Sequence, residues 1–95
     1  MNTFKLIVST PDGDMFNGEA YMISLRGTEG SLAVMAGHIP FITAVLPGEC
    51  RIDPAGEEAD DLVGVTDGGL LTVSPDSVTL LSGGFRWQTE TPPGR

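Results

Sequence analysis

The chain has 95 residues, a formal net charge of -8 at pH 7 and one cysteine, Cys50. A chain of this length buries roughly 60 to 65% of the surface that its unfolded form exposes, which leaves room for one core and not two. The negative charge excludes DNA and RNA as partners, because it repels the phosphate backbone. A lone cysteine also excludes an internal disulfide and favours a reducing compartment.

Thirteen glycines and seven prolines are many for so short a chain, and they indicate turn-rich β structure. No apolar run approaches the length of about 18 residues that a membrane-spanning helix needs. The start "MNTFKLIVSTPDGD" lacks the charged region and apolar block of a signal peptide. We therefore expect a soluble, unprocessed protein.

The first predicted strands show the alternation of apolar and polar residues that is typical of half-buried β structure. In "FKLIVS" every second residue from Phe4 to Val8 is apolar, and "AYMISLR" places Tyr21, Ile23 and Leu25 on one face. Asp12-Gly13 follows the first strand and predicts a tight hairpin turn, since glycine adopts the positive φ angles that such turns require.

The middle of the chain contains one ambiguous run, "HIPFITAVLPG", which two prolines bracket. We interpret it as a loop followed by a strand. The next run, "ECRID", predicts a strand with Cys50 and Ile52 facing the core. Asp53-Pro54-Ala55-Gly56 then marks a turn, and the acidic residues after it, Glu57, Glu58, Asp60 and Asp61, are interpreted as a solvated loop.

The last third continues with the predicted strands "DLVGV", "GLLTVS" and "SVTLLS", separated by Asp67-Gly68-Gly69 and Ser74-Pro75-Asp76. The spacing of roughly six to ten short strands is close to that of a β-sandwich, and the turns favour antiparallel pairing. No long stretch has a helical period, so near-zero helix is expected. Residues 1–88 are predicted to form the domain, and residues 89–95, which are polar and proline-rich, a flexible tail.

Few residues of the sequence are arranged for catalysis or for the binding of metals or phosphate. A zinc site needs several His or Cys ligands at short spacing, and His38 and Cys50 are the sole examples of their kinds. No serine lies in a nucleophile-elbow context, "DPAGEEADD" does not match a calcium loop, and no glycine-rich turn matches a phosphate loop. No catalytic residue, metal or cofactor is predicted.

The segment around His38 is the remaining candidate for function. It is braced by glycines and prolines, carries little charge and is rich in apolar residues (Leu32, Val34, Met35, Ile39, Phe41 and Ile42). Some of these residues must belong to the core. The remainder resembles a protein-protein contact, so His38 is interpreted as a structural or interface residue.

Several motifs together resemble one family. "TPDGDMFNGEA", "TEGSL", "GHIP" with "TAVLPGE", "RI" and the closing "GGLLTVSPDSVTLL" are similar to the N-terminal β-sandwich domain of the epsilon subunit of F-type ATP synthases, which is called delta in mitochondria. The resemblance extends from about Phe4 to about Gly84. It implies a flattened antiparallel sandwich of about ten strands, in agreement with the pattern above.

The resemblance also implies a function. Epsilon is a non-catalytic rotor subunit that clasps the gamma subunit and rests on the polar loops of the c-ring, so that proton transport is coupled to ATP synthesis, and it meets the catalytic alpha/beta head indirectly. It would be peripheral, at the cytoplasmic face of the inner (plasma) membrane, and held there through the complex. The residues that match the family's contact segments are Glu29, Gly30, Ser31, Leu32, His38 and Pro40.

The sequence departs from the family in two respects. Many relatives have an acid and a proline where this chain has Ser31 and Ala36, and typical bacterial members continue as a helical hairpin, whereas this chain ends at "RWQTETPPGR". We expect a short form that neither inhibits itself through that hairpin nor binds nucleotide. Two alternatives are a free-standing module that binds a ligand such as a carbohydrate through "GHIP" and Trp87, and an enzyme with His38 as its base.

Overall fold

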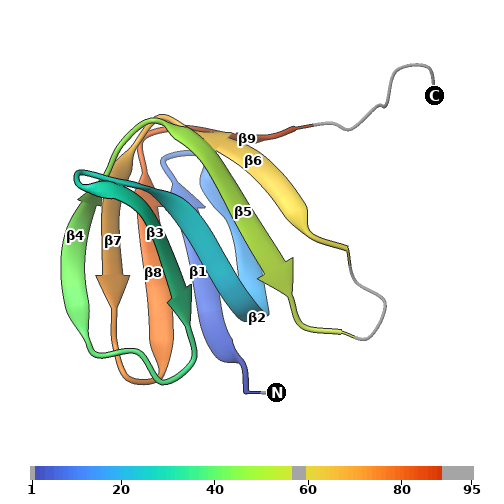
Figure 1. Cartoon of the computed structure of the whole chain (residues 1–95). Coiled ribbons are helices and arrows are strands. Elements are labelled where there is room, and N and C mark those ends of the chain that lie inside the picture. Colours follow the sequence, from blue (N-terminus) through green and yellow to red (C-terminus); the bar gives the residue numbers. More distant parts are fainter. Residues whose placement is uncertain (1, 57–59, 89–95) are drawn as a thin grey trace.

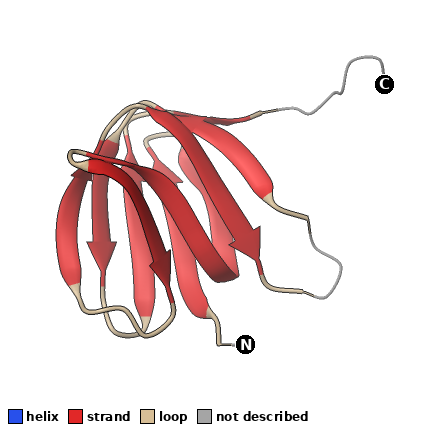
Figure 2. Ribbon diagram, viewed as in Figure 1, coloured by secondary structure: helices blue, strands red, loops and turns tan. Residues whose placement is uncertain are grey.

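The computed structural model describes residues 2–56 and 60–88, and in these ranges it contains nine strands and no helix (Figure 2). The predicted all-β class is confirmed, with nine strands in place of about ten. The strands are β1 (Phe4–Thr10), β2 (Gly13–Gly27), β3 (Gly30–Met35), β4 (Phe41–Val45), β5 (Gly48–Pro54), β6 (Leu62–Thr66), β7 (Gly69–Val73), β8 (Ser77–Ser82) and β9 (Phe85–Trp87). The ambiguous run is a loop followed by strand β4, as predicted.

The long strand β2 connects the two layers of the sandwich (Figure 1). Its first half pairs with β1 and ends at Ala20, which lies opposite Phe4. A register shift between Ala20 and Met22 then bends the strand, and its second half pairs with β3 and β5. Strands that pass from one sheet to the other through such irregularities form the corners of a sandwich. One layer therefore contains β1, β8, β7, β4 and the start of β2, and the other contains β3, β5, β6, β9 and the end of β2.

One strand pair is parallel. β1 lies beside β8 with Lys5 opposite Ser77 and Ser9 opposite Leu81, whereas every other strand pair in the described part is antiparallel. The predicted antiparallel sandwich is confirmed, with this one parallel pair as an exception that the sequence did not indicate. The turn signals report pairing between strands that follow each other in sequence, and they carry no information about strands from the two ends of the chain.

The turns divide into two kinds. Asp12-Gly13 begins the β1–β2 hairpin, with Gly13 at a φ of 125°, and Ser74 to Ser77 closes the β7–β8 hairpin, as predicted. Asp67-Gly68, in contrast, joins β6 to β7, which are not paired and belong to different layers. The antiparallel pairing that this turn signal favoured is therefore not formed between β6 and β7. The Thr66 hydroxyl on one side of this crossing lies 2.6 Å from the Ser82 hydroxyl, and this buried pair holds the crossing against the end of β8.

The core lies between the layers and follows the predicted alternation. Leu6, Val8, Ile23, Cys50 and Ile52 have no exposed surface. Their sequence neighbours Lys5, Glu49 and Arg51 are exposed, which confirms the inward and outward assignment of β1 and β5. Tyr21 is half-buried because it lies at the bend of β2. Two polar residues are buried with the core, Thr66 and Ser82.

Parts of the sequence-based description lie outside the described residues. These are Glu57 and Glu58 of the acidic loop and the tail 89–95, so the division into a domain over 1–88 and a tail stays a prediction. Asp60 and Asp61 are exposed, in agreement with a solvated loop. Over residues 2–56 and 60–88 no helix is long and apolar enough to cross a membrane.

Candidate docking surface

The β2–β3 turn presents the first group of predicted contact residues. Glu29 is exposed at the turn, and Gly30 follows with a φ of 118°, a conformation that residues with a side chain rarely adopt. The two residues after it point in opposite directions, as the alternation of β3 requires. Ser31 is exposed, whereas Leu32 is half-buried and packs against the core.

The β3–β4 loop presents the second group. His38 and Pro40 are exposed, and the imidazole ring packs at a tilted angle on Phe41, with 5.7 Å between the ring centroids. Ile39 is 77% exposed, more than any other large apolar residue of the described part. A shallow, mainly apolar depression lies here, lined by Met35, Ala36, Gly37, His38, Ile39 and Phe41. No charged side chain lines it, so it can bind an apolar surface but has no group for acid-base chemistry besides the imidazole.

The two groups stand at opposite ends of β3, which at about 3.3 Å per residue separates them by roughly 20 Å. The resemblance implies that both face the same partner. They do share one side of the sandwich, where β3 and β4 run past each other without pairing. An open groove of about 490 Å³ lies between these strands, lined by Gly27, Thr28, Glu29, Gly30, Ser31, Leu32, Phe41, Ile42 and Thr43.

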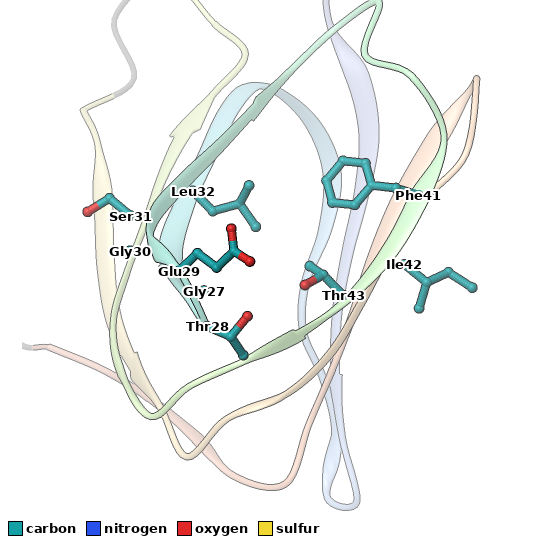
Figure 3. A pocket seen from close by; sticks show the side chains of 9 residues that line it. All are labelled: Gly27, Thr28, Glu29, Gly30, Ser31, Leu32, Phe41, Ile42 and Thr43. Atoms are coloured by element: carbon teal, nitrogen blue, oxygen red, sulfur yellow. The ribbon is translucent and has the colours of Figure 1, made fainter.

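Figure 3 shows this groove from its mouth. Leu32 and Phe41 lie across from each other, Glu29, Thr28 and Thr43 surround the opening, and Ile42 points away from it. At one end the groove is closed by the pairing of Gly27 with Val45 and a backbone hydrogen bond from Leu46 N to Arg26 O.

Sequence reasoning did not include Phe41, Ile42 and Thr43 among the site residues. Phe41 lines both the groove and the apolar depression, so it joins the two predicted groups into one surface. The apolar content of "HIPFITAVLPG" was the signal that could have identified Phe41. What the sequence lacked was the information that β3 and β4 are neighbours in space that do not pair.

A second surface covers the outer face of β4, β7, β8 and β1. Two rows of paired residues cross these strands, and none of their side chains is charged. One row is Ile42, Thr72, Thr79 and Ile7, and the other is Ala44, Leu70, Leu81 and Ser9. We call this set the uncharged face. Ile42, Leu70 and Leu81 are 65%, 41% and 51% exposed, although the chain carries a net charge of -8.

The outer face of the other layer has the opposite character. Arg51 of β5 is exposed there and lies 3.9 Å from the Glu49 carboxylate and 3.7 Å from that of Asp61. These exposed ion pairs contribute little to stability. Arg86 on β9 is also exposed, so this face is polar and mixed in charge.

The surroundings of Cys50 and Trp87 are those of residues that stabilise the fold. Burial, with a smaller contribution from the charge of Glu49, raises the pKa of the Cys50 thiol from 9.0 to about 12, so the thiolate nucleophile is suppressed. Trp87 packs edge-on against Phe85 at 4.9 Å and covers the core, which leaves the ring little surface for a carbohydrate. Over residues 2–56 and 60–88, no three His, Cys, Asp or Glu side chains are grouped to hold a metal ion.

The sequence is similar to bacterial proteins named ATP synthase epsilon chain. It is 40% identical over 81 residues to that of Herminiimonas arsenicoxydans, an alignment that spans 85% of this chain and 57% of the relative. It is 36% identical over 90 residues to that of Clostridium perfringens, spanning 95% of this chain and 66% of the relative. The chain thus spans less than two thirds of the length of these relatives.

The fold is similar to chains in two solved assemblies. One is the Euglena gracilis mitochondrial ATP synthase, OSCP/F1/c-ring, with a TM-score of 0.81 and 21% identity over 90% of this chain and 53% of that chain. The other is the central stalk and c-ring of the Tetrahymena thermophila mitochondrial ATP synthase, with a TM-score of 0.74 and 18% identity over 90% of this chain and 66% of that chain. Residues 3–88 match the family described as ATP synthase, Delta/Epsilon chain, beta-sandwich domain. With this match over nearly its whole length and a two-layer β fold that agrees with it, the chain belongs to the ATP synthase delta/epsilon family.

Proposed function

We propose that this chain is a non-catalytic rotor subunit of an F-type ATP synthase, which links the gamma subunit to the membrane c-ring and so couples proton transport to ATP synthesis. It meets the alpha/beta head indirectly and is peripheral, at the cytoplasmic face of the inner (plasma) membrane. Family membership supports the proposal. The observation that carries it is that this small sandwich has two surfaces of different character, which meet at β4 and are suited to two partners.

The uncharged face is the surface that we assign to the gamma subunit. A subunit that turns with its partner needs a contact that does not dissociate during rotation, and large, apolar contacts are typical of permanent complexes. Four adjacent strands offer exposed Ile42, Leu70 and Leu81 without a charge between them. Covering them removes apolar surface from water and leaves no ionised group to desolvate.

The β3–β4 side, with the residues from Glu29 to Leu32 and the loop at His38 and Pro40, is the surface that we assign to the c-ring loops. Cytoplasmic loops of membrane proteins are enriched in Lys and Arg. The groove presents the Glu29 carboxylate and has no Lys or Arg in its lining. This contact includes a carboxylate that binding would desolvate, whereas the uncharged face has none, so we expect it to be the weaker of the two.

The first test replaces Leu81 by Lys. A charge at the centre of the uncharged face would be desolvated in the complex, and we expect co-purification with gamma at micromolar concentration to fall at least tenfold, about 1.4 kcal/mol. The control is Gln88→Lys, which adds the same charge to an exposed position outside the uncharged face. If the unmodified chain does not bind gamma at micromolar concentration, the proposed function is wrong.

The second test replaces Glu29 by Lys. Reversal of this charge is expected to weaken attachment of the catalytic head to membranes at low salt, and less so at about 0.3 M salt, where the Debye length is short. Glu49→Lys makes the same change of charge on the polar face and serves as control. Equal sedimentation of the head with membranes for both variants would contradict the role given to the β3–β4 side.

A further inference from the structure

Strands β3 and β4 are edge strands that lack the usual protection. Exposed edges present unpaired backbone groups, and proteins protect them with charged residues, prolines, bulges or very short strands. β3 is "GSLAVM" and β4 is "FITAV", and neither contains a charged residue or a proline. Among the strands of residues 2–56 and 60–88, β3 pairs only with β2, and β4 pairs along its length only with β7, apart from the Gly27–Val45 bridge.

The other edges of the sandwich show the contrast. β9 is three residues long and has Arg86 at its centre. The first half of β2 has Asp14 and Glu19 on its outward positions, and the pairing of β1 with it is interrupted by a register shift. Protection is thus present at the far edges and missing at the two edges that face the groove. A surface that is left open in this way is one that a partner covers.

The groove has the dimensions and lining for one extended segment. At about 3.4 Å per residue, the five residues of β4 define a length of roughly 17 Å, which is enough for a segment of about five residues. Leu32 and Phe41 are half-buried side chains at its walls, and they can receive the apolar side chains of a strand with period 2 (Figure 3). The Thr28 and Thr43 hydroxyls and the Glu29 carboxylate lie at the mouth.

The charge of the groove indicates which kind of segment can bind in it. Glu29 is the one ionisable residue among the nine that line the groove. A second copy of this chain would bring its own Glu29 and its own net charge of -8 to the contact, so a symmetric β3–β3 dimer is opposed by repulsion. A basic segment would be attracted.

We infer that the groove between β3 and β4 accepts a short, extended, basic segment of a partner protein as an added β-strand. The segment pairs through its backbone with the free edge of β3, places an apolar side chain against Leu32 and Phe41, and places a Lys or Arg beside Glu29. Backbone pairing supplies the affinity and the side-chain positions supply the selectivity. The inference rests on the proposed function only in that a neighbouring subunit supplies the segment.

The test uses three synthetic peptides and the isotopically labelled full chain. The probe is acetyl-Val-Lys-Val-Lys-Val-amide. One control peptide has Glu in place of both Lys residues, and the other has Pro in place of the central Val, which removes a backbone donor and prevents strand pairing. Amide signals and amide hydrogen exchange of residues 30–35 and 41–44 are followed by NMR as each peptide is added.

The expected result is a saturable shift of these signals with the Lys peptide, with exchange of the edge amides of β3 slowed about tenfold when the site is full. The two control peptides should bind at least about fivefold more weakly. Glu29→Lys should reduce binding of the Lys peptide by a similar factor, whereas Glu49→Lys, the same change of charge on the polar face, should leave it unchanged. An absence of saturable shifts, equal binding of the Glu peptide, or shifts centred on Leu70 and Leu81 of the uncharged face would overturn the inference. So would slowed exchange in β3 that grows with protein concentration alone, since a second copy would then be the occupant.

A last measurement separates this inference from the proposed function. Hydrogen exchange of residues 30–35 is compared between the isolated chain and its assembled complex. If the chain assembles with gamma and the c-ring but these amides exchange at the same rate, strand addition fails and the rotor role stands. If it does not assemble and the Lys peptide still fills the groove, the rotor role fails and the strand-binding property stands.

Discussion

Cys50 is a residue whose surroundings decide its chemistry. It has no exposed surface in the middle of β5, and its thiol has a pKa raised from 9.0 to about 12, first by burial and then by the charge of Glu49. The thiolate is disfavoured because the interior does not solvate its charge. Cys50 is therefore a small core residue, as the alternation of its strand predicted.

This shift predicts a pH dependence of stability. The folded-state pKa lies above the unfolded value, so the stability that the thiol contributes is complete below pH 9.0 and is lost as the pH rises from 9.0 towards 12. The loss should approach about 1.4 kcal/mol per pH unit for this one group. Urea unfolding at pH 8 and pH 10, followed by Trp87 fluorescence, should show a smaller decrease for Cys50→Ala than for the unmodified chain. An equal decrease in both proteins would show that the thiol does not contribute.

At the scale of elements, glycines allow strands and turns to approach more closely than other residues would. A Cβ on Gly69 would overlap the backbone carbonyl of Leu81 in the neighbouring strand β8, and one on Gly64 would overlap the Phe85 ring of β9. Gly68 has a φ of 98° where the chain crosses between layers, and a Cβ there would lie 2.8 Å from the Val45 carbonyl oxygen. Gly68 and Gly69 permit the close contacts that bring β4, β7 and β8 into one uncharged face, and Gly64 permits the contact between β6 and the Phe85 ring of β9.

Gly69→Ala tests this account. The overlapping atom is backbone and cannot rotate away, so we expect the β7–β8 pairing to shift and the free energy of unfolding to fall by roughly 2 to 4 kcal/mol. Gly83→Ala is the matched control, because its Cβ would meet no atom within 4 Å. That variant should stay within about 0.5 kcal/mol of the unmodified chain in urea unfolding. A similar loss in both variants would contradict close approach as the cause, because the loss at Gly83 could not come from an overlap and backbone entropy alone favours Ala over Gly.

At the scale of the whole molecule, the sandwich is held together by contacts between distant parts of the chain. The pairing of β1 with β8 joins the two ends of the described sequence, and β2 connects both layers. Most residues that lie close together in the fold are far apart in the sequence, so most contacts form only after large loops have closed. This architecture is stiff because no layer can open without the loss of β2 or the β1–β8 pairing.

Such a topology predicts slow folding. Proteins dominated by non-local strand pairing fold in milliseconds to seconds, whereas helical domains of similar size fold in microseconds to milliseconds. Refolding from urea in a stopped-flow instrument, with Trp87 fluorescence as the signal, should therefore show its main amplitude after the first few milliseconds. Completion of the signal within the dead time would contradict the role given to the distant pairing.

The sequence by itself determined the local properties of this protein. Alternating apolar residues predicted the inward positions of β1 and β5, the Asp-Gly and Pro-containing turns predicted where strands end, and the motifs from "TPDG" to "VTLL" indicated the family. It also named the β2–β3 turn and the loop at His38 as candidate contacts. These features depend on residues close together in the chain, which is the range over which periodicity and turn chemistry act.

The tertiary structure alone decided which strands are neighbours. That β1 pairs in parallel with β8, that Asp67-Gly68 crosses between layers, and that β3 and β4 face each other unpaired all depend on contacts between distant residues. The uncharged face and the groove arise from this arrangement, because their rows combine residues from strands far apart in sequence. No local pattern specifies such pairs. The free energy of burying all the strands together selects them, and it becomes visible only in the folded chain.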